Sequence, residues 1–421
     1  MVNVDISNVW TCVSFPELLG SEQDVFDAHN RLRDNQPEGP NFMSWLHIPT
    51  VAAERLIEGI GQAARTICDQ SEILLVCGSG GAYHGTKAAI EAYCGADRNL
   101  RRRPRILHIG QSLSTRQWMD LSRLLQDRDY SLYILSPDGQ ALAANVAVRG
   151  LRWMMERKYG ADAKNRIYVA TMVGTPLHTM AQEEGYTVFP LPKKLGGAAS
   201  VLTSAAFVPM AVAGIDPSAV LEGAKESDKE LDIRSFENPA WLYAAARKVL
   251  LNKGRNRELF CLTDHNLQAL GQWWQRKVRR QNSGLTTETV LLPGDLEDTD
   301  HLANLPQSRI FETIVRFEAD TRKVPVEMDW KDYDGLGALS GKCMADVEQS
   351  VLQAMIQVHN AAGVPILDVE AGELSAENLG ALLHFLELSA ALTSMMIDET
   401  PFAAEESAVY SAALESLGTN S

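Results

Sequence analysis

The stretch Glu72-Ile-Leu-Leu-Val-Cys-Gly-Ser-Gly-Gly-Ala-Tyr-His-Gly-Thr-Lys-Ala-Ala-Ile-Glu-Ala-Tyr93 decides the fold of this chain. Its first part, residues 73–77, is a short apolar run typical of a buried parallel strand. Glycines follow at once and lead into a helix over residues 82–93. A strand that passes through glycines into a helix directs backbone N–H groups at any anion above the helix N-terminus. The same pattern also fits a tight turn without a ligand, and no Gly-Lys-Ser/Thr sequence closes it as in a P-loop.

Further strands and helices alternate around this stretch. The expected strands cover residues 73–77, 105–109, 132–135, 167–170 and 187–189. The expected helices cover residues 51–69, with Thr50 as N-cap, and 82–93, 115–126, 141–159 and 175–184. Five strands joined by crossover helices predict an α/β fold with a doubly wound parallel sheet.

A second α/β unit is expected beyond residue 195. Its strands are predicted at residues 258–262, 289–292, 310–317 and 366–369. Its helices are predicted at residues 198–213, 216–230, 238–252, 266–279, 345–359 and 375–397, before a last helix at 402–417. The expected division is an irregular N-terminal segment (1–50), two αβα subdomains (51–195 and 196–400) and a C-terminal helix (401–421).

Composition narrows the function classes. The net charge of −15 over 421 residues argues against a nucleic-acid surface and favours a soluble, acidic, cytoplasmic protein. The first residues lack the pattern of a signal peptide, and no apolar run approaches the ~20 residues that span a bilayer. The six cysteines form no C-x-x-C pair, so we expect reduced core thiols rather than disulfides or a zinc site.

Two longer motifs stand out, Gly78-Ser-Gly-Gly-Ala-Tyr-His-Gly85 and Leu195-Gly-Gly-Ala-Ala-Ser-Val-Leu-Thr203. Shorter ones are Glu237-Asn-Pro239, Trp273-Trp274, Phe311-Glu-Thr313 and Thr400-Pro-Phe402. From about residue 40 to the end, these motifs resemble, in the same order, those of the bacterial glucose-6-phosphate isomerase family, whose two longer motifs read Gly-Ile-Gly-Gly-Ser-Tyr-Leu-Gly and Val-Gly-Gly-Arg-Phe-Ser-Val-Leu-Thr. The resemblance implies two sugar-isomerase (SIS) αβα subdomains, each with a mostly parallel sheet flanked by helices, and additional C-terminal helices. It also implies a homodimer that interconverts an aldose and a ketose phosphate without metal or organic cofactor.

The family positions that hold the sugar phosphate can be carried over one at a time. The family's Ser-Lys-Ser-Gly-Thr-Thr-Thr-Glu loop falls on Ser136-Pro-Asp-Gly-Gln-Ala-Leu-Ala143, which places a carboxylate, Asp138, where a phosphate would lie. At ~4 Å and an effective dielectric of ~20, one pair of like charges repels by ~4 kcal/mol. Without a ligand, Asp138-Gly139 would be a plain strand-to-helix turn. The ligand-binding positions implied by the resemblance are Gly80, Gly81, Ala82, Ser136, Asp138, Gly139, Gln140, Gly197, Ala198 and Ser411.

The catalytic positions also depart from the family. Its enediolate-stabilising arginine falls on Ala198, and its lysine in the C-terminal helix falls on Ser411. The general base of Gly-Glu-Ser-Glu-Gly-Lys falls on Gln281, or on Arg280 if the alignment shifts by one residue, and neither can take a carbon-bound proton as a carboxylate does. The family histidine is best matched by His301, which a surface role would also explain.

Three alternative functions follow. In the first, the chain is a glucose-6-phosphate isomerase-like pseudoenzyme that binds a sugar or sugar phosphate, or regulates a true isomerase by pairing with it. In the second, it is an active isomerase of glycolysis and gluconeogenesis with a rearranged site. There Lys277, Arg279 or Arg280 would bind phosphate, and Glu288 or Glu297 would be the base. A pure interaction module, resting on the expected dimer, is the third alternative.

Overall fold

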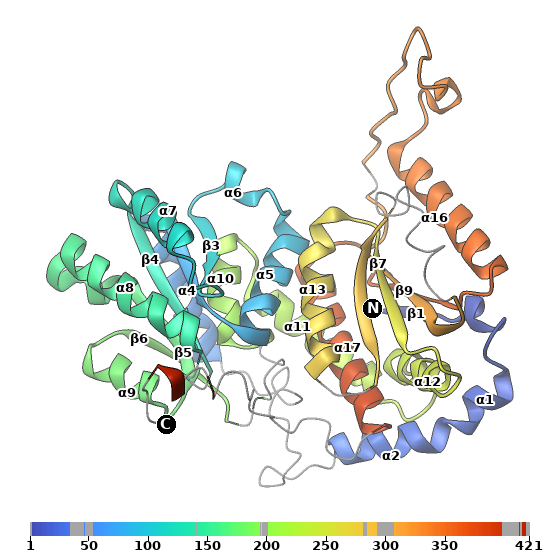
Figure 1. The fold of residues 1–421 in the computed structure, drawn as a ribbon, viewed down its shortest axis with the longest axis horizontal. Helices are drawn as coiled ribbons and strands as arrows, with labels where there is room; N and C mark the ends of the chain where they lie inside the picture. Colours follow the sequence, from blue (N-terminus) through green and yellow to red (C-terminus); the bar gives the residue numbers. More distant parts are fainter. Residues whose placement is uncertain are drawn as a thin grey trace.

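The structure is a computed structural model that describes residues 2–33, 46, 54–137, 139, 141–193, 195, 201–280, 284–292, 307–320, 322–397, 412 and 415–417. Within these residues the chain forms two α/β units, each built on a five-stranded sheet (Figure 1). The first sheet has the order β3-β2-β4-β5-β6, and all its strands are parallel. Its strands are β2 (Ile73–Gly78), β3 (Arg105–Ile109), β4 (Tyr130–Leu135), β5 (Ile167–Met172) and β6 (Thr187–Leu191). The doubly wound sheet predicted from the sequence is therefore confirmed.

Helices cover both faces of the first sheet. They are α4 (Glu54–Gln70), α5 (Gly80–Cys94), α6 (Arg98–Arg101), α7 (Thr115–Gln126), α8 (Leu142–Tyr159), α9 (Pro176–Glu183) and α10 (Ser204–Ala213). Both β2 and β4 are buried along their whole length, as expected for central parallel strands. Helix α10 packs against α4 and α5. It begins later than the predicted residue 198, because Thr203 is its N-cap and accepts from the N–H of Ala205.

The second sheet has the order β1-β10-β9-β7-β8. Its strands are β1 (Asn3–Asp5), β7 (Arg257–Leu262), β8 (Thr286–Leu291), β9 (Ile310–Arg316) and β10 (Ile366–Glu370). Only β1 runs antiparallel to its neighbour. The main helices of this unit are α11 (Pro217–Leu231), α12 (Pro239–Asn252), α13 (Gln268–Arg280), α16 (Met344–Ala361) and α17 (Ala376–Met395).

The N-terminal segment is not merely irregular, so that expectation was wrong. Besides β1 it contains α1 (Phe15–Gly20) and α2 (Glu22–Arg33). Helix α2 buries Val25, Ala28 and Leu32, whose spacing of three and four residues places them on one helical face. This face packs against α12 and α17 of the second unit.

Close helix contacts hold the second unit together and join it to the first. Helices α11 and α17 pack so tightly that a Cβ at Gly223 or Gly380 would overlap backbone of the facing helix. Helix α5 of the first unit packs against α13 of the second, and the two helices lie side by side at the centre of Figure 1. The α5–α13 contact is thus a main junction between the two units.

Three other predictions can be compared with the structure. All six cysteines are free, but Cys68 is exposed, so they are not all core thiols. None of the described helices is long and apolar enough to cross a bilayer. The predicted C-terminal helix lies almost wholly outside the described residues.

Candidate functional site

The strand order predicts a ligand-binding crevice at the carboxyl ends of β2 and β4. The chain leaves β2 for β3 on one side and then crosses to β4 on the other, so the topology reverses between β2 and β4. Ligands of open α/β sheets bind at such a switch point. The two strand ends approach so closely that a Cβ at Gly78 would overlap the carbonyl oxygen of Leu135. Glycine is therefore required where the first glycine-rich turn leaves the sheet.

The first wall of the crevice is the N-terminus of α5. Ser79 is the N-cap residue, but its side chain makes no capping hydrogen bond. Gly80 follows with φ of +71°, a conformation that favours glycine. Backbone N–H groups of the first turn, from Gly80 to Ala82, therefore have no side-chain cap from Ser79, as in helix N-termini that bind anions.

The second wall is the loop that follows β4. Ser136 is buried, and its hydroxyl accepts a hydrogen bond of 3.1 Å from the N–H of Gly139. Gly139 has φ of +75°, and its carbonyl accepts a 2.8 Å bond from Nδ2 of Asn145 in α8. These bonds hold Ser136 in a turn beside the α5 N-terminus, because β2 and β4 are adjacent and parallel.

The structure thus brings together five of the predicted positions, namely Gly80, Gly81, Ala82, Ser136 and Gly139. The other predicted positions lie outside the described residues: Asp138, Gln140, Gly197, Ala198, Gln281, His301 and Ser411. Glu297, proposed as a substitute base, lies outside them as well.

Lys277 is not a phosphate ligand, which corrects one sequence-based alternative. Its side chain is buried in α13, and its Nζ lies 3.8 Å from Oε1 of the buried Glu387 in α17. Burial lowers the pKa of Lys277 and raises the pKa of Glu387, and each is opposed by the charge of the other. The helical pattern of α13 places position 277 on the face that meets the rest of the protein, together with Trp273 and Trp274.

Glu288 and Arg279 have different surroundings. Glu288 lies on β8 and forms an ion pair with Arg257 of the neighbouring strand β7. Arg279 is exposed near the C-terminal end of α13. Of Lys277, Arg279 and Glu288, only Arg279 has an exposed side chain.

Two positioning residues escaped the sequence analysis. Asn145 holds the carbonyl of Gly139, and Gln111 donates from Nε2 to the carbonyl of Gly78 at 3.0 Å. Asn145 could have been identified from the sequence, because it is a polar side chain in the first turn of the helix that follows β4. Gln111 lies two residues after β3, the strand next to β2, and the loops that follow parallel strands meet at the same edge of the sheet.

Comparison of sequences finds relatives along almost the whole chain. Glucose-6-phosphate isomerase of Fusobacterium nucleatum is 30% identical over 411 residues, covering 95% of this chain and 92% of that protein. The enzyme of Bacillus cytotoxicus is 30% identical over 413 residues, with the same coverage of 95% and 92%. No protein-family model matches the chain.

Solved structures support the fold. A hypothetical protein from Thermus thermophilus superposes with a TM-score of 0.87 at 19% identity, covering all of both chains. A glucose-6-phosphate isomerase from Chlamydia trachomatis superposes with a TM-score of 0.76 at 15% identity, covering 95% of this chain and 84% of that one. The two parallel-sheet units are thus sugar-isomerase subdomains, and the chain belongs to the glucose-6-phosphate isomerase family.

Proposed function

We propose that this protein is a sugar- or sugar-phosphate-binding relative of glucose-6-phosphate isomerase whose isomerase activity is lost or strongly reduced. The main support for this proposal comes from the surroundings of Lys277 and Glu288, two residues that could have replaced the lost phosphate ligand and the lost base. Lys277 is buried against Glu387, and Glu288 pairs with Arg257, so neither is a ready replacement for a lost phosphate ligand or base.

The residue types at the family's chemical positions support the same conclusion. Ala198 stands at the position of a charge-stabilising arginine, and loss of one such donor costs ~10²–10³ in rate. Gln281 stands at the base position, and loss of general base catalysis costs ~10²–10⁴. Asp138 would repel a phosphate dianion in the loop after β4. Even partial combination of these penalties leaves negligible turnover.

Turnover of fructose 6-phosphate tests the proposal. We expect a rate far below the ~10 s⁻¹ of a typical enzyme, and a rate within about tenfold of that value would reject the proposal. Thermal shifts with fructose 6-phosphate and with unphosphorylated fructose provide the binding readout. A ligand at about 100 times its Kd adds ~2.7 kcal/mol of stability, so binding is detected without catalysis.

The alternative is an active isomerase with a rearranged site. The identity of 30% to glucose-6-phosphate isomerases over 95% of the chain favours it. In this reading Arg279 or Arg280 binds the phosphate, and Glu288 or Glu297 is the base. The paired substitution Glu288→Gln and Glu297→Gln discriminates, because turnover that persists unchanged would exclude this route. The substitution Asp27→Asn, in α2, is the matched surface control.

We further propose that the protein is a cytoplasmic homodimer. It would also be able to form a heterodimer with a chain of a true isomerase. Support comes from the arm of residues 322–343, the orange segment that projects above α16 in Figure 1. The arm is closed by a bond of 2.9 Å from the N–H of Val326 to the carbonyl of Lys342, and it carries Trp330 and Tyr333 at 90% and 83% exposure. Large exposed aromatic groups of this kind mark interaction surfaces. We also propose that the boundary between the two subdomains lies near residue 195.

Sedimentation velocity tests the dimer. We expect a dimer at micromolar concentration and a shift toward monomer in the Trp330→Asp variant. Leu100→Asp, which changes a residue of 80% exposure in α6, is the matched control. A monomeric wild-type protein would count against the homodimer.

A further inference from the structure

The outer edge of β3 lies open beside a cavity of about 860 Å³. In the described chain, β3 is the terminal strand of its sheet and pairs only with β2. Edge strands present unpaired backbone N–H and C=O groups to any segment that can add to the sheet. The cavity shares Gln111 with the crevice between β2 and β4, but the outer edge of β3 lies on the side of the strand away from β2.

Among the described residues, those of α6 cover only the first part of this edge. Asn99 of α6 donates from Nδ2 to the carbonyl of Ile106 and accepts from its N–H, both at 2.8 Å, as a neighbouring strand would. These bonds show that the backbone groups of Ile106 point away from β2. Because backbone directions alternate along a strand, His108 presents its N–H and C=O on the same outer side.

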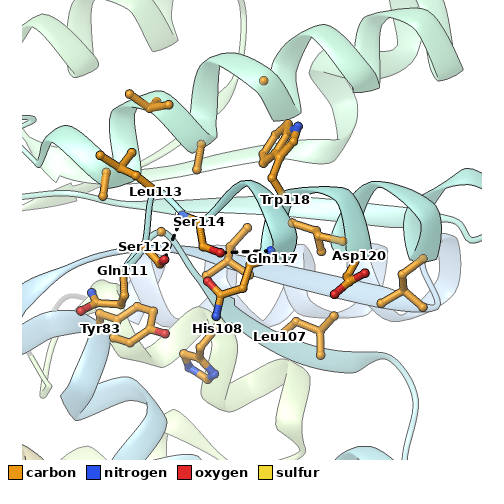
Figure 2. Close-up of a pocket in the computed structure, with 18 of the residues that line it drawn as sticks. Tyr83, Leu107, His108, Gln111, Ser112, Leu113, Ser114, Gln117, Trp118 and Asp120 are labelled. Carbon is orange, nitrogen blue, oxygen red and sulfur yellow. Dashed lines mark hydrogen bonds between the residues drawn. The ribbon is translucent and has the colours of Figure 1, made fainter.

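The cavity continues around both faces of this edge (Figure 2). On one face it is bounded by Leu107 of β3 and by Leu121 and Leu124 of α7, which stay only partly buried although they form the apolar face of that helix. Its rim carries Leu113 and Val146, which are 61% and 49% exposed. This face therefore offers an apolar wall that the described chain leaves unfilled.

The other face is polar and belongs to α5. Tyr83, Lys87 and Glu91 follow one another at intervals of four residues, so they form a stripe along the helix. His108 extends from β3 toward this stripe, and its ring lies 5.4 Å from that of Tyr83. Its Nε2 is buried and has no hydrogen-bond partner among the described residues. Burial, assisted by the charge of Lys87, lowers the pKa of His108 to about 3, so the ring is neutral at pH 7.

We propose that the slot between α5 and α7 binds an extended peptide segment of a partner protein, which adds to the first sheet as a sixth strand next to β3. An added strand places alternate side chains on the two faces of a sheet. Its apolar residues would contact Leu121 and Leu124, and its polar residues would meet the α5 stripe. The backbone N–H and C=O of His108 would pair with the peptide backbone.

Charge complementarity specifies the peptide. Lys87 and Glu91 are four residues apart on a helix, ~6 Å along its axis, and their side chains form an ion pair of 3.7 Å that an added pair of opposite charges would extend. Side chains two residues apart on one face of a strand are ~6.6–6.8 Å apart. A peptide with an acidic residue and a basic residue two positions apart, separated and flanked by apolar residues, therefore matches both walls. Its direction along β3 decides which charge comes first in its sequence.

Peptide titration tests this site with fluorescently labelled probes. The probes are Ac-Leu-Glu-Leu-Lys-Leu-NH₂ and its reversed sequence, Ac-Leu-Lys-Leu-Glu-Leu-NH₂, titrated to about 1 mM, the range of weak complexes. We expect one of the two to bind, and N-methylation of its backbone amides to weaken binding about tenfold by removing strand hydrogen bonds. Binding of neither probe, or binding unchanged by N-methylation, would overturn the proposal.

Matched variants locate the site. Leu124→Glu should abolish binding, whereas Met119→Glu, on the same helix but outside the cavity lining, should leave it unchanged. The Lys87→Glu variant should bind Ac-Leu-Lys-Leu-Lys-Leu-NH₂ more tightly than the probe that binds the wild type. Misfolding would weaken the binding of both peptides and would not exchange the preference. Equal loss in the Leu124→Glu and Met119→Glu variants would contradict the location. Self-association of wild type that Leu124→Glu abolishes would instead identify a second copy of this chain as the occupant and overturn the partner peptide.

Discussion

Two buried ion pairs in the second unit should respond in opposite ways to apolar replacement. The pair of Lys277 and Glu387 is separated by 3.8 Å, and neither carboxylate oxygen of Glu387 accepts a hydrogen bond from the described residues. At an effective dielectric of ~20, the attraction over this distance is ~4 kcal/mol. Desolvation costs several kcal/mol for each ion, so the attraction does not offset it. We therefore predict that the double variant Lys277→Met/Glu387→Leu is as stable as wild type, or more stable by about 1–4 kcal/mol.

Glu258 and Arg247 provide the contrasting case. The carboxylate of Glu258 accepts hydrogen bonds from Arg247, Tyr243, Trp274, Thr287 and Thr313, and all of these groups are buried. The double variant Arg247→Met/Glu258→Leu leaves four polar side chains without this acceptor, at about 1–3 kcal/mol for each one left unsatisfied. It should be strongly destabilised.

Urea unfolding at pH 7, followed by tryptophan fluorescence, measures both effects. Trp273 and Trp274 report on the relevant region, since they lie in α13 next to both pairs. The single variant Lys277→Met should lose about 1–3 kcal/mol, because the pKa of Glu387, already raised to about 7, rises further without the lysine and leaves a protonated buried carboxyl with no hydrogen-bond partner among the described residues. A loss above about 2 kcal/mol in Lys277→Met/Glu387→Leu would refute this reasoning, because apolar replacement of a buried ion pair is expected to be neutral or stabilising.

Three further predictions concern the first unit. Gly78→Ala should destabilise the protein by about 1–3 kcal/mol in thermal unfolding, because its Cβ overlaps the carbonyl of Leu135; an unchanged melting temperature would contradict the close approach. Asn145→Ala should cost about 1 kcal/mol by releasing the carbonyl of Gly139, and should reduce the thermal shift given by sugar ligands; full retention of that shift would exclude Asn145 as a positioning residue. His108 stays neutral when folded but binds a proton when unfolded below pH ~6.5, so folding stability should fall with pH below that value. The His108→Leu variant should show a smaller loss between pH 7 and pH 5, and an equal loss would show that another group is responsible.

The sheets were predictable because buried parallel strands are apolar throughout. Residues 73–77 and 167–170 contain little but aliphatic and small side chains, so the strand positions followed from composition alone. Strand β1 could not be found in this way. It is three residues long, and it depends on pairing with β10 more than 360 positions later in the chain, from Asn3 to Glu370.

The candidate site was predictable in position but not in its supporting contacts. The glycines of the β2–α5 turn and the Ser136–Gly139 turn are local features, and the strand order brings them to one edge. The surroundings of Lys277 depend instead on the contact between α13 and α17. This contact brings Glu387, which is distant in sequence, next to the lysine. A sequence that contains both residues gives no sign that they meet, so Lys277 could be mistaken for a free cation.

The proposed function requires that the chain keeps the family fold but has lost proton transfer. Exchange of solvent deuterium into fructose 6-phosphate, followed by proton NMR, tests it most directly, because exchange detects proton abstraction from C1 even when net isomerisation is slow. With a stabilising thermal shift demonstrating that the ligand is bound, we predict no incorporation above the protein-free control. Deuterium at C1 at the rate of an ordinary isomerase would contradict the claim.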